Sequence, residues 1–390
     1  MTDLLTAIPV LLGLLTLPGS LVLALWSIAA LLPARRATAM PAEKGRLAIV
    51  VPAHNEEDGI ARTVRGLRQA CKDDGNSQLW VVADNCTDDT AHLAARAGAH
   101  VLQRHDTNCR GKGHALEFAF RQLADQGVSW FVVIDADSTV DDGFLAHLRR
   151  AMHPSRQALQ ACYLSRPTHT LRGRLARLAQ FGFNRVRLLG RSRLGASVGL
   201  LGNGFALRAD TIAQVPYTAH SVAEDLEYHL HLALAGFTVH HVPGARVWGE
   251  IAETGIGAAQ QRARWEGGRL RMVREWSVAL LASSMRGQPH VLEPLAELWL
   301  LPLGLHVALL ALAALGMHPV GLLATGTGVV AVTLYLLAIA LRTPVSRGEL
   351  AALMLAPAYV LWKLTLLPLT LAKSRRNASW VRAERAAHTR

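Results

Sequence analysis

The feature that most constrains this chain is the presence of two long stretches without a charged side chain. They cover residues 4–34 and 298–341, which are 31 and 44 consecutive positions without Asp, Glu, Lys or Arg. A helix needs about 20 predominantly apolar residues to cross a bilayer. Of the 390 residues, 51% are hydrophobic and 18% are charged, whereas a soluble domain has about 25% charged residues. The pattern therefore excludes a wholly soluble protein and an intrinsically disordered chain.

The N-terminal stretch predicts an uncleaved transmembrane anchor over residues 1–45. A cleaved signal peptide has a basic start and an apolar core of about 7–15 residues, whereas here the acidic Asp3 precedes a longer apolar run. Four basic residues follow the run: Arg35, Arg36, Lys44 and Arg46. Basic residues beside a span mark the cytoplasmic side. We therefore expect an integral protein of the cytoplasmic (inner) membrane, with the middle of the chain in the cytoplasm.

The middle of the chain, residues 46–267, alternates short apolar runs with amphipathic stretches. The runs predict strands over 47–51, 79–83, 101–103 and 130–134, and the stretches between them predict helices over 60–70, 90–97 and 115–124. Alternation of this kind is typical of a mostly parallel sheet with helices on both faces. The expected fold class is therefore α/β, a cytosolic domain joined to an α-helical membrane region.

The C-terminal part, residues 298–372, predicts two membrane spans and a third segment that is open to two interpretations. Residues 298–315 and 320–341 are the two spans. The third segment, 350–371, is apolar but contains Pro357, Lys363 and Pro368. If it crossed the bilayer, the basic tail 373–390 would lie outside, against the positive-inside rule. A re-entrant or interface-lying element keeps the tail in the cytosol and fits the charges better, and a third span is the alternative.

Basic residues are concentrated between the two membrane regions. The formal net charge is +12, and residues 143–209 contain twelve Arg and no acidic residue. Leu171, Leu175 and Leu178 share one face of a predicted helix that has arginines beside it. One interpretation is a solvated basic helix, and the other is an interfacial helix or acceptor-binding face at anionic headgroups. Residues 268–297 have a similar pattern and predict amphipathic interfacial helices.

Polar side chains follow the predicted strands. Asp84 follows the second strand, and Asp135 and Asp137 follow the fourth. Ligands of open α/β sheets bind at the carboxyl ends of the strands, and two carboxylates at i and i+2 can chelate Mg²⁺ or Mn²⁺. Taken alone, Asp-x-Asp also occurs in exposed turns. The chain has neither GxGxxG nor GxxxxGK[ST], which excludes the dinucleotide and P-loop types of phosphate binding.

Two further groups of residues have a functional and a structural interpretation. Asp225 begins a predicted helix, where a carboxylate can be a general base or a helix cap. Gln261, Arg264 and Trp265 share one helix face. Arginine binds phosphates through its forked guanidinium, and tryptophan offers a flat apolar surface. The structural alternative for these three is a helix that packs on its own domain.

The order of these segments resembles a known family. The segments are VVPAHNEE, VVADNCTDDT, RGKGHAL, VIDADS, GNGFALR, AEDLEYHL and QRARW, between Val50 and Trp265. Together they resemble the family 2 glycosyltransferases, in particular the membrane-embedded branch of cellulose, hyaluronan and poly-N-acetylglucosamine synthases and of ceramide glucosyltransferase. The resemblance implies a GT-A fold, a Rossmann-like sheet of the kind that the pattern predicts.

The resemblance also implies roles for individual residues in binding the donor. Pro52 and Glu56 would line a nucleoside pocket, and Asp84 would contact the base. Lys112 would lie near the base or the diphosphate. Asp135 and Asp137 would hold the nucleotide and a divalent cation, Mg²⁺ or Mn²⁺.

On the acceptor side, the resemblance implies that Asp225 deprotonates the acceptor hydroxyl. Glu224 would bind substrate beside it, in a segment that reads Ala-Glu-Asp where the family usually has Thr-Glu-Asp. Gln261, Arg264 and Trp265 would close over the diphosphate and the acceptor sugar.

The function that follows is a membrane-bound, inverting, metal-dependent glycosyltransferase. It would move a hexose from a nucleotide sugar, expected to be a UDP sugar, to a polysaccharide or lipid-linked acceptor in cell-surface or exopolysaccharide synthesis. One alternative is a single addition to a glycolipid or polyprenyl phosphate, and another is a nucleotide-sensing pseudoenzyme in a membrane complex. No gating-loop motif follows Trp265, which disfavours a processive, channel-forming synthase.

The expected partners are the nucleotide sugar, the acceptor, membrane lipids and other export or polymerisation proteins. Nucleic acid is excluded as a partner because aromatic residues make up only 6% of the chain and no recognition motif is present.

Overall fold

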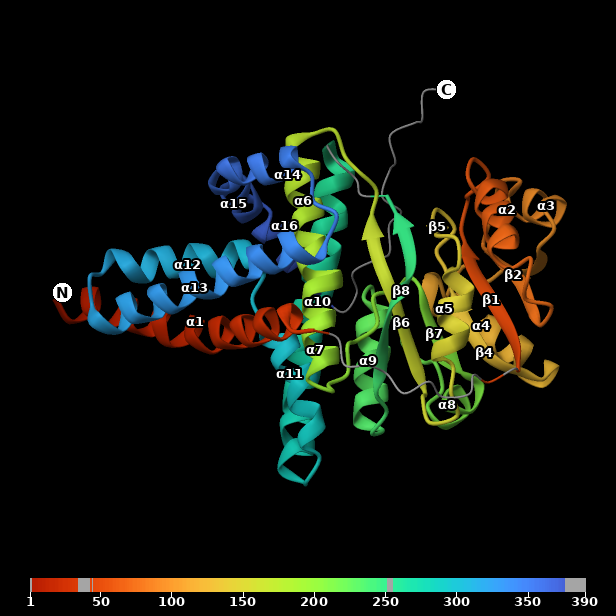
Figure 1. The fold of residues 1–390 in the computed structure, drawn as a ribbon, viewed down its shortest axis with the longest axis horizontal. Helices are drawn as coiled ribbons and strands as arrows, with labels where there is room; N and C mark the ends of the chain where they lie inside the picture. The colour runs from red at the N-terminus through yellow and green to blue at the C-terminus, as the bar shows by residue number, and fades with distance from the viewer. Residues whose placement is uncertain (1, 34–42, 44, 251–254, 376–390) are drawn as a thin grey trace.

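The computed structural model describes residues 2–33, 43, 45–250 and 255–375. Figure 1 shows a sheet-containing part and, projecting from it, three helices that lie side by side. These are α1 (Thr2–Leu31), α12 (Leu303–Leu315) and α13 (Pro319–Arg342). Three of the four basic residues predicted to follow the anchor, namely Arg35, Arg36 and Lys44, lie outside the described residues, as does most of the predicted basic tail.

The sheet has eight strands in the order β3-β2-β1-β4-β7-β6-β8-β5. Their bounds are β1 Arg46–Ala53, β2 Ser77–Asp84, β3 His100–Arg104, β4 Val128–Val133, β5 Thr139–Val140, β6 Ala158–Ser165, β7 Phe205–Arg208 and β8 Val239–Gly249. Strands β3, β2, β1 and β4 are parallel, as is the pair β6 and β8. Strand β7 is antiparallel to both of its neighbours, and β5 is antiparallel to β8. The predicted Rossmann-like sheet is confirmed, with a mixed half after β4.

Both faces of the sheet are buried under helices. Leu47, Ile49 and Val51 of β1 face one core and Ala48 and Val50 face the other, and all five are at most 1% exposed. This alternation is the period-two pattern of a strand. The first face is covered by α2 (Ile60–Ala70), α3 (Thr90–Arg96) and α5 (Phe144–Ala151), and the second by α4 (Lys112–Leu123), α8 (Ala209–Gln214) and α9 (Glu224–Leu234).

Two described helices are long and apolar enough to cross a membrane, α1 from Ala7 onward and α13. The predicted span over 298–315 is not one straight helix. Helix α11 (Leu292–Trp299) ends before Pro302, and α12 begins after it at an angle of 76°. Proline lacks an N–H group and disfavours helical backbone in the residue before it, so the helix cannot continue through this position.

The segment with two interpretations is also broken. It contains α14 (Arg347–Ala352), α15 (Ala356–Thr365) and α16 (Leu367–Lys373), with a bend of 48° before α16. Pro357 and Pro368 occupy the first turns of α15 and α16, where proline costs no hydrogen bond. A bend of this kind occurs in a re-entrant loop and in a broken span, so the topology of residues 350–371 stays a prediction.

The sheet and the projecting helices are joined by α6 (Leu171–Phe181), a π-helical turn over residues 182–187, α7 (Leu188–Arg193) and α10 (Gly255–Met285). Helix α10 runs unbroken through residue 267, where the sequence predicted a domain boundary. The interpretation of the helix that carries Leu171, Leu175 and Leu178 as a solvated basic helix is wrong for Arg177, which is 5% exposed. Arg187 and Arg191, further along the chain, are also at most 5% exposed. The three arginines are bonded to Glu349, Glu297 and Glu293, from segments more than 100 residues downstream.

Candidate active site

The carboxyl ends of the parallel strands β1, β2 and β4 meet at one edge of the sheet, which opens into a cavity of about 1970 Å³. The predicted site residues come from these strand ends, from the starts of α4 and α9, and from α10. All of them line this cavity: Pro52, Glu56, Asp84, Lys112, Asp135, Asp137, Glu224, Asp225, Gln261, Arg264 and Trp265. Tertiary structure thus brings together residues that are up to 213 positions apart in the sequence.

Asp84, the last residue of β2, is held by two neighbours. Its carboxylate accepts a hydrogen bond from Arg104 Nη1 at 2.7 Å, and both side chains are at most 9% exposed. Asn85 follows in the left-handed region, with φ 52°, and donates to the Asp84 carboxylate from Nδ2 at 3.0 Å. These two hydrogen bonds hold the Asp84 carboxylate in one orientation at the cavity wall.

The turn after β1 places Pro52 and Glu56 on the cavity wall. Asn55 adopts φ 54°, and the Glu56 backbone N–H donates to Thr90 Oγ1 at 2.8 Å. Thr90 begins α3, so the turn after β1 is tied to the turn after β2. This contact fixes the distance between the two parts of the predicted nucleoside pocket.

Lys112 lies at the centre of the acidic residues. Its Nζ donates to the Asp135 carboxylate and to the carbonyl oxygen of Gly202. Burial by itself would lower the Lys112 pKa, but the charges of Asp135, Glu224 and Asp225 outweigh burial and raise it above its ordinary value. Lys112 is therefore a permanent positive charge at this edge of the sheet.

Asp135 and Asp137 follow β4 and both line the cavity. The Asp135 backbone N–H donates to Asn203 Oδ1 at 3.2 Å. Burial raises the Asp135 pKa, Lys112 opposes this, and the charge of Asp137 raises it further. Mg²⁺ and Mn²⁺ prefer oxygen ligands such as carboxylates. A cation bound between Asp135 and Asp137 would also relieve the repulsion between their negative charges. The residues present therefore fit the predicted divalent ion.

Glu224 and Asp225 occupy the first turn of α9, which points into the cavity. Burial, together with the charge of Asp225, raises the Glu224 pKa to about 7. Burial also raises the Asp225 pKa, which the Leu226 N–H opposes by donating to Asp225 Oδ1 at 2.8 Å. A carboxylate with a raised pKa is a better proton acceptor near neutral pH, which suits Asp225 as a general base.

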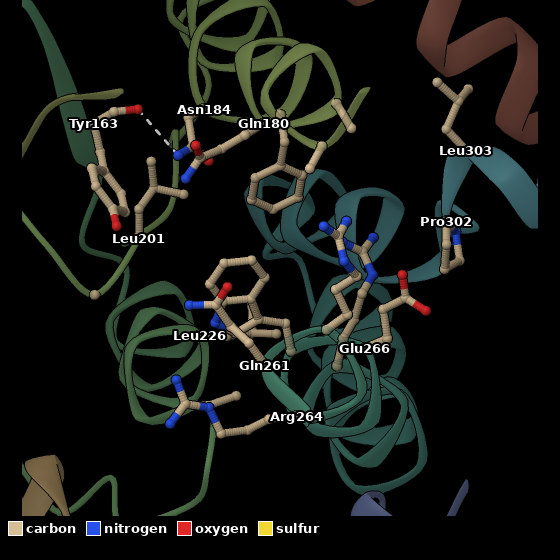
Figure 2. Close-up of a pocket in the computed structure, with 18 of the residues that line it drawn as sticks. Tyr163, Gln180, Asn184, Leu201, Leu226, Gln261, Arg264, Glu266, Pro302 and Leu303 are labelled. Carbon is tan, nitrogen blue, oxygen red and sulfur yellow. Dashed lines mark hydrogen bonds between the residues drawn. The ribbon is translucent and has the colours of Figure 1, made fainter. Parts of the chain in front are cut away.

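Gln261, Arg264 and Trp265 extend from α10 into the cavity. In Figure 2 the Arg264 guanidinium points away from Glu266 and Pro302. Burial raises the pKa of both Asp135 and Glu224, and the charge of Arg264 opposes this rise in each case. Arg264 thus lies on the side of α10 that faces the acidic cluster. Trp265 is 44% exposed, which leaves its ring available to a ligand.

Comparison with known proteins identifies the chain. The model of glycosyl transferase family group 2 matches residues 130–367, and that of glycosyl transferase family 2 matches residues 48–208. The chain belongs to glycosyltransferase family 2. Beta-monoglucosyldiacylglycerol synthases of a Nostoc species and of Trichormus variabilis are 26% identical to it over 246 residues, which is 60% of this chain and 51% of theirs. The chain thus matches about half the length of these relatives.

A mannosyltransferase of Pyrobaculum calidifontis, solved with GDP-mannose and Mn²⁺, has a similar fold. The TM-score is 0.58 at 18% identity, and the match covers 86% of this chain and 98% of that one. The GT-A fold of this glycosyltransferase is therefore confirmed, as is its predicted family.

Three parts of the glycosyltransferase's site were not predicted from sequence. Arg104 forms the ion pair with Asp84 across two strands, and no motif marks it. Gly202 lies so close to Asp225 that a Cβ would be 3.0 Å from its Oδ2, and its φ is 74°. Gly202 belongs to the segment GNGFALR, which is part of the family resemblance but whose residues were given no role in the site. The third part is an apolar extension of the cavity.

This extension, here called the apolar passage, runs from α10 to the projecting helices. It is lined by side chains of α12, α13 and α15, among them Leu303, Val307, Ala311, Leu336, Val360 and Leu364. Figure 2 shows Pro302 and Leu303 on the opposite side of Gln261 from Leu201 and Tyr163. One cavity therefore has a charged end at the sheet and an apolar end between α12, α13 and α15.

Proposed function

We propose that this glycosyltransferase transfers a sugar from a nucleoside diphosphate sugar to a lipid-linked acceptor, with inversion. The observation that carries the proposal is the continuity of the acidic sheet edge with the apolar passage. The charged end suits a diphosphate and a sugar, and the apolar end suits a hydrocarbon tail, whose burial is favourable. A soluble sugar acceptor would need no such passage.

The donor is expected at the strand ends. Asp84 would bind the base, for which uracil is the expected identity, and Pro52 and Glu56 would line the nucleoside pocket. Lys112 and Arg264 would stabilise the negative charge that grows on the leaving diphosphate. Asp135 and Asp137 would hold Mg²⁺ or Mn²⁺, which supplies further neutralisation of that charge when bound.

The chemistry is one displacement at the anomeric carbon. An acceptor oxygen forms the new bond to that carbon while the bond to the diphosphate oxygen breaks, and the acceptor proton passes to the Asp225 carboxylate. General-base catalysis of this kind contributes about 10²–10⁴-fold in rate. Glu224 would bind substrate beside the base, and Gln261 and Trp265 would position the acceptor.

We also propose how the chain sits in the membrane. The anchor 1–45 and the helices of 298–372 hold the domain 46–267 on the cytoplasmic face of the inner membrane, with residues 268–297 at the interface and a cytosolic tail from 373. Tethering places the donor site beside lipids, which replaces a bimolecular encounter by positioning.

The test is incubation of membranes containing the full chain with radiolabelled nucleotide sugars and Mg²⁺ or Mn²⁺. We expect a labelled, lipid-extractable product with one sugar added, and no ladder of polymers. Chelation of the divalent ion should abolish incorporation, and added Mn²⁺ should restore it. Polymeric products alone, or no incorporation from any nucleotide sugar, would contradict the proposal.

A further inference from the structure

Arg262 is a buried cation with free hydrogen-bond donors on the wall of the apolar passage. Its side chain lines the cavity and is 9% exposed. Nη1 donates to the Tyr359 hydroxyl, but Nε and Nη2 have no partner among the residues that the structure describes. Buried donors of a charged group are costly when they are left unpaired, so their retention on a cavity wall indicates an anionic ligand.

Arg262 does not face the donor site. Residues two apart on a helix point in directions about 200° apart, and Arg264 faces Asp135 and Glu224. Glu266, four residues after Arg262, lies on the same side of α10 as Arg262. Figure 2 shows Glu266 on the side of Pro302, with Arg264 directed away from it. The two arginines of the QRARW segment therefore serve different ends of the cavity.

The surroundings of Arg262 are aromatic and positively charged. Its guanidinium lies 5.4 Å from the ring centroid of Tyr359 and 5.3 Å from that of Trp362, both on α15. Arg172 of α6 lies over the same Trp362 ring at 4.2 Å. Lys363 is bonded to Glu266, which leaves three cations and one anion in this group. Burial lowers the Arg262 pKa, Tyr359 and Glu266 oppose this, and Arg172 lowers it further. Glu266 is one anion against three cations, so positive charge remains in excess here.

The charged group opens onto the part of the passage that suits a hydrocarbon chain. Val360 and Leu364 flank it on α15, and Val307 lines the passage on α12. Aromatic residues such as Tyr359 and Trp362 are typical of the boundary between a bilayer and water. An anion bound by Arg262 would therefore lie where the headgroup of a lipid meets its tail.

We propose that Arg262, supported by Arg172 and Lys363, binds the phosphate group of a phosphate-bearing lipid acceptor. The forked guanidinium matches phosphate oxygens and forms charge-assisted hydrogen bonds with them. The inference rests on the proposed function and narrows its acceptor from lipids in general to lipids whose tail is joined to the headgroup through phosphate.

The test is calorimetric binding to the full-length protein in neutral detergent. The probes are dioctanoyl phosphatidic acid, dioctanoylglycerol and inorganic phosphate. We expect the lipid phosphate to bind at least about 10-fold more tightly than either of the others, because it alone offers both the anion and the tails. Equal affinity for the two lipids would overturn the proposal, and equal affinity for inorganic phosphate would assign the site to a free anion.

Variants of Arg262 test whether this residue causes the preference for the lipid phosphate. Arg262→Gln should lose the preference for the lipid phosphate, and Arg262→Lys should retain a part of it, because a point charge lacks the fork. Arg271→Gln is the matched control, since Arg271 lies on the same helix, pairs with Glu275 and does not line the cavity. Nucleotide affinity should be unchanged in all three variants.

An unchanged preference in Arg262→Gln would overturn the assignment. If that variant does not fold, Arg262→Lys decides, because it keeps the charge and the apolar stem, and an undiminished preference there would overturn the proposal as well. Sugar transfer to lipids without preference for phosphate would remove this site and leave the proposed function intact. If the protein binds lipid phosphate but glycosylates no lipid, the proposed function is overturned and the phosphate site is retained.

Discussion

At the scale of single residues, the candidate active site is a cluster of buried carboxylates around Lys112. Burial and mutual repulsion raise the pKa values of Asp135, Glu224 and Asp225, while Lys112 lowers them. Such a cluster is unfavourable for folding and favourable for binding a cation and accepting a proton. A cluster that destabilises the fold but favours binding is therefore typical of a site that is completed by its ligands.

Asp225→Asn should fold and bind nucleotide sugar but lose sugar transfer by about 10²–10⁴-fold, because the amide cannot accept the acceptor proton. The measurement is the initial rate of transfer beside nucleotide affinity. Asp210→Asn is the control, since Asp210 is a half-exposed partner of Arg208 outside the cavity. Near-normal turnover of Asp225→Asn would remove Asp225 from the role of base.

The rate of transfer should rise with pH toward neutrality. The Glu224 pKa is about 7, above its ordinary value of 4.5, so below neutral pH the Glu224–Asp225 pair retains a proton that the base must release. Glu224→Gln removes the repulsion within the pair, and the rise in kcat/KM should then move to lower pH. The measurement is the pH profile of kcat/KM for both proteins. A midpoint that moves to higher pH in the variant would contradict the assignment.

At the scale of elements, buried ion pairs join helices that are distant in sequence. Glu297 of α11 lies 3.2 Å from Arg187 of the π-helical turn, 3.5 Å from Arg191 of α7 and 3.4 Å from Arg269 of α10. One carboxylate thus connects three segments at the base of the projecting helices. Removing one partner of a buried pair leaves the other charges uncompensated.

Glu297→Gln should lower the free energy of unfolding by about 3–5 kcal/mol, because the buried guanidinium groups of Arg187 and Arg191 and the half-buried one of Arg269 lose their shared anion. Glu275→Gln is the matched control, since it breaks the i,i+4 pair with Arg271 on the more exposed surface of α10, which is worth about 0.3–0.5 kcal/mol. Thermal unfolding in detergent compares the two. Equal melting temperatures would show that Glu297 contributes no more than a surface charge.

At the scale of the whole molecule, α1 is packed against the rest of the protein as well as being apolar enough to span a membrane. Trp26 is 4% exposed, and its backbone lies so close to Gly190 of α7 that a Cβ there would be 2.2 Å from the Trp26 carbonyl oxygen. Arg193 Nη1 donates to the Ala29 carbonyl at 3.0 Å. The first helix therefore belongs to the fold.

Replacement of residues 2–31 by an unrelated apolar helix of the same length should keep the protein in the membrane but lower its melting temperature and its transfer rate. The physical reason is the loss of the contacts of α1 with α7 and α13, which position the wall of the cavity. Membrane fractionation, thermal unfolding and the transfer assay give the three readouts. Wild-type stability of the replaced protein would show that α1 is an anchor alone.

The strands and helices of the sheet were predictable because their residues follow a local period. The helix over residues 60–70 was predicted with its observed bounds, and the strands at 47–51 and 79–83 lie within β1 and β2. Local patterns also place a polar residue after each strand. The break at Pro302 was not predicted, because an apolar run of sufficient length predicts a span whatever its internal turns.

The amino-acid sequence by itself determined the family, the Rossmann-like sheet and the set of residues at its edge, because parallel strands bring their carboxyl ends to one place. Only the tertiary structure decided the pairing of Asp84 with Arg104, the burial of Arg187 against Glu297, and the apolar passage that leads from α10 to α12. These features depend on contacts between segments far apart in the chain, whose geometry no local period encodes. The sequence shows that residue 262 is an arginine, but only the packing of α10 against α15 determines that two of its donors are unpaired.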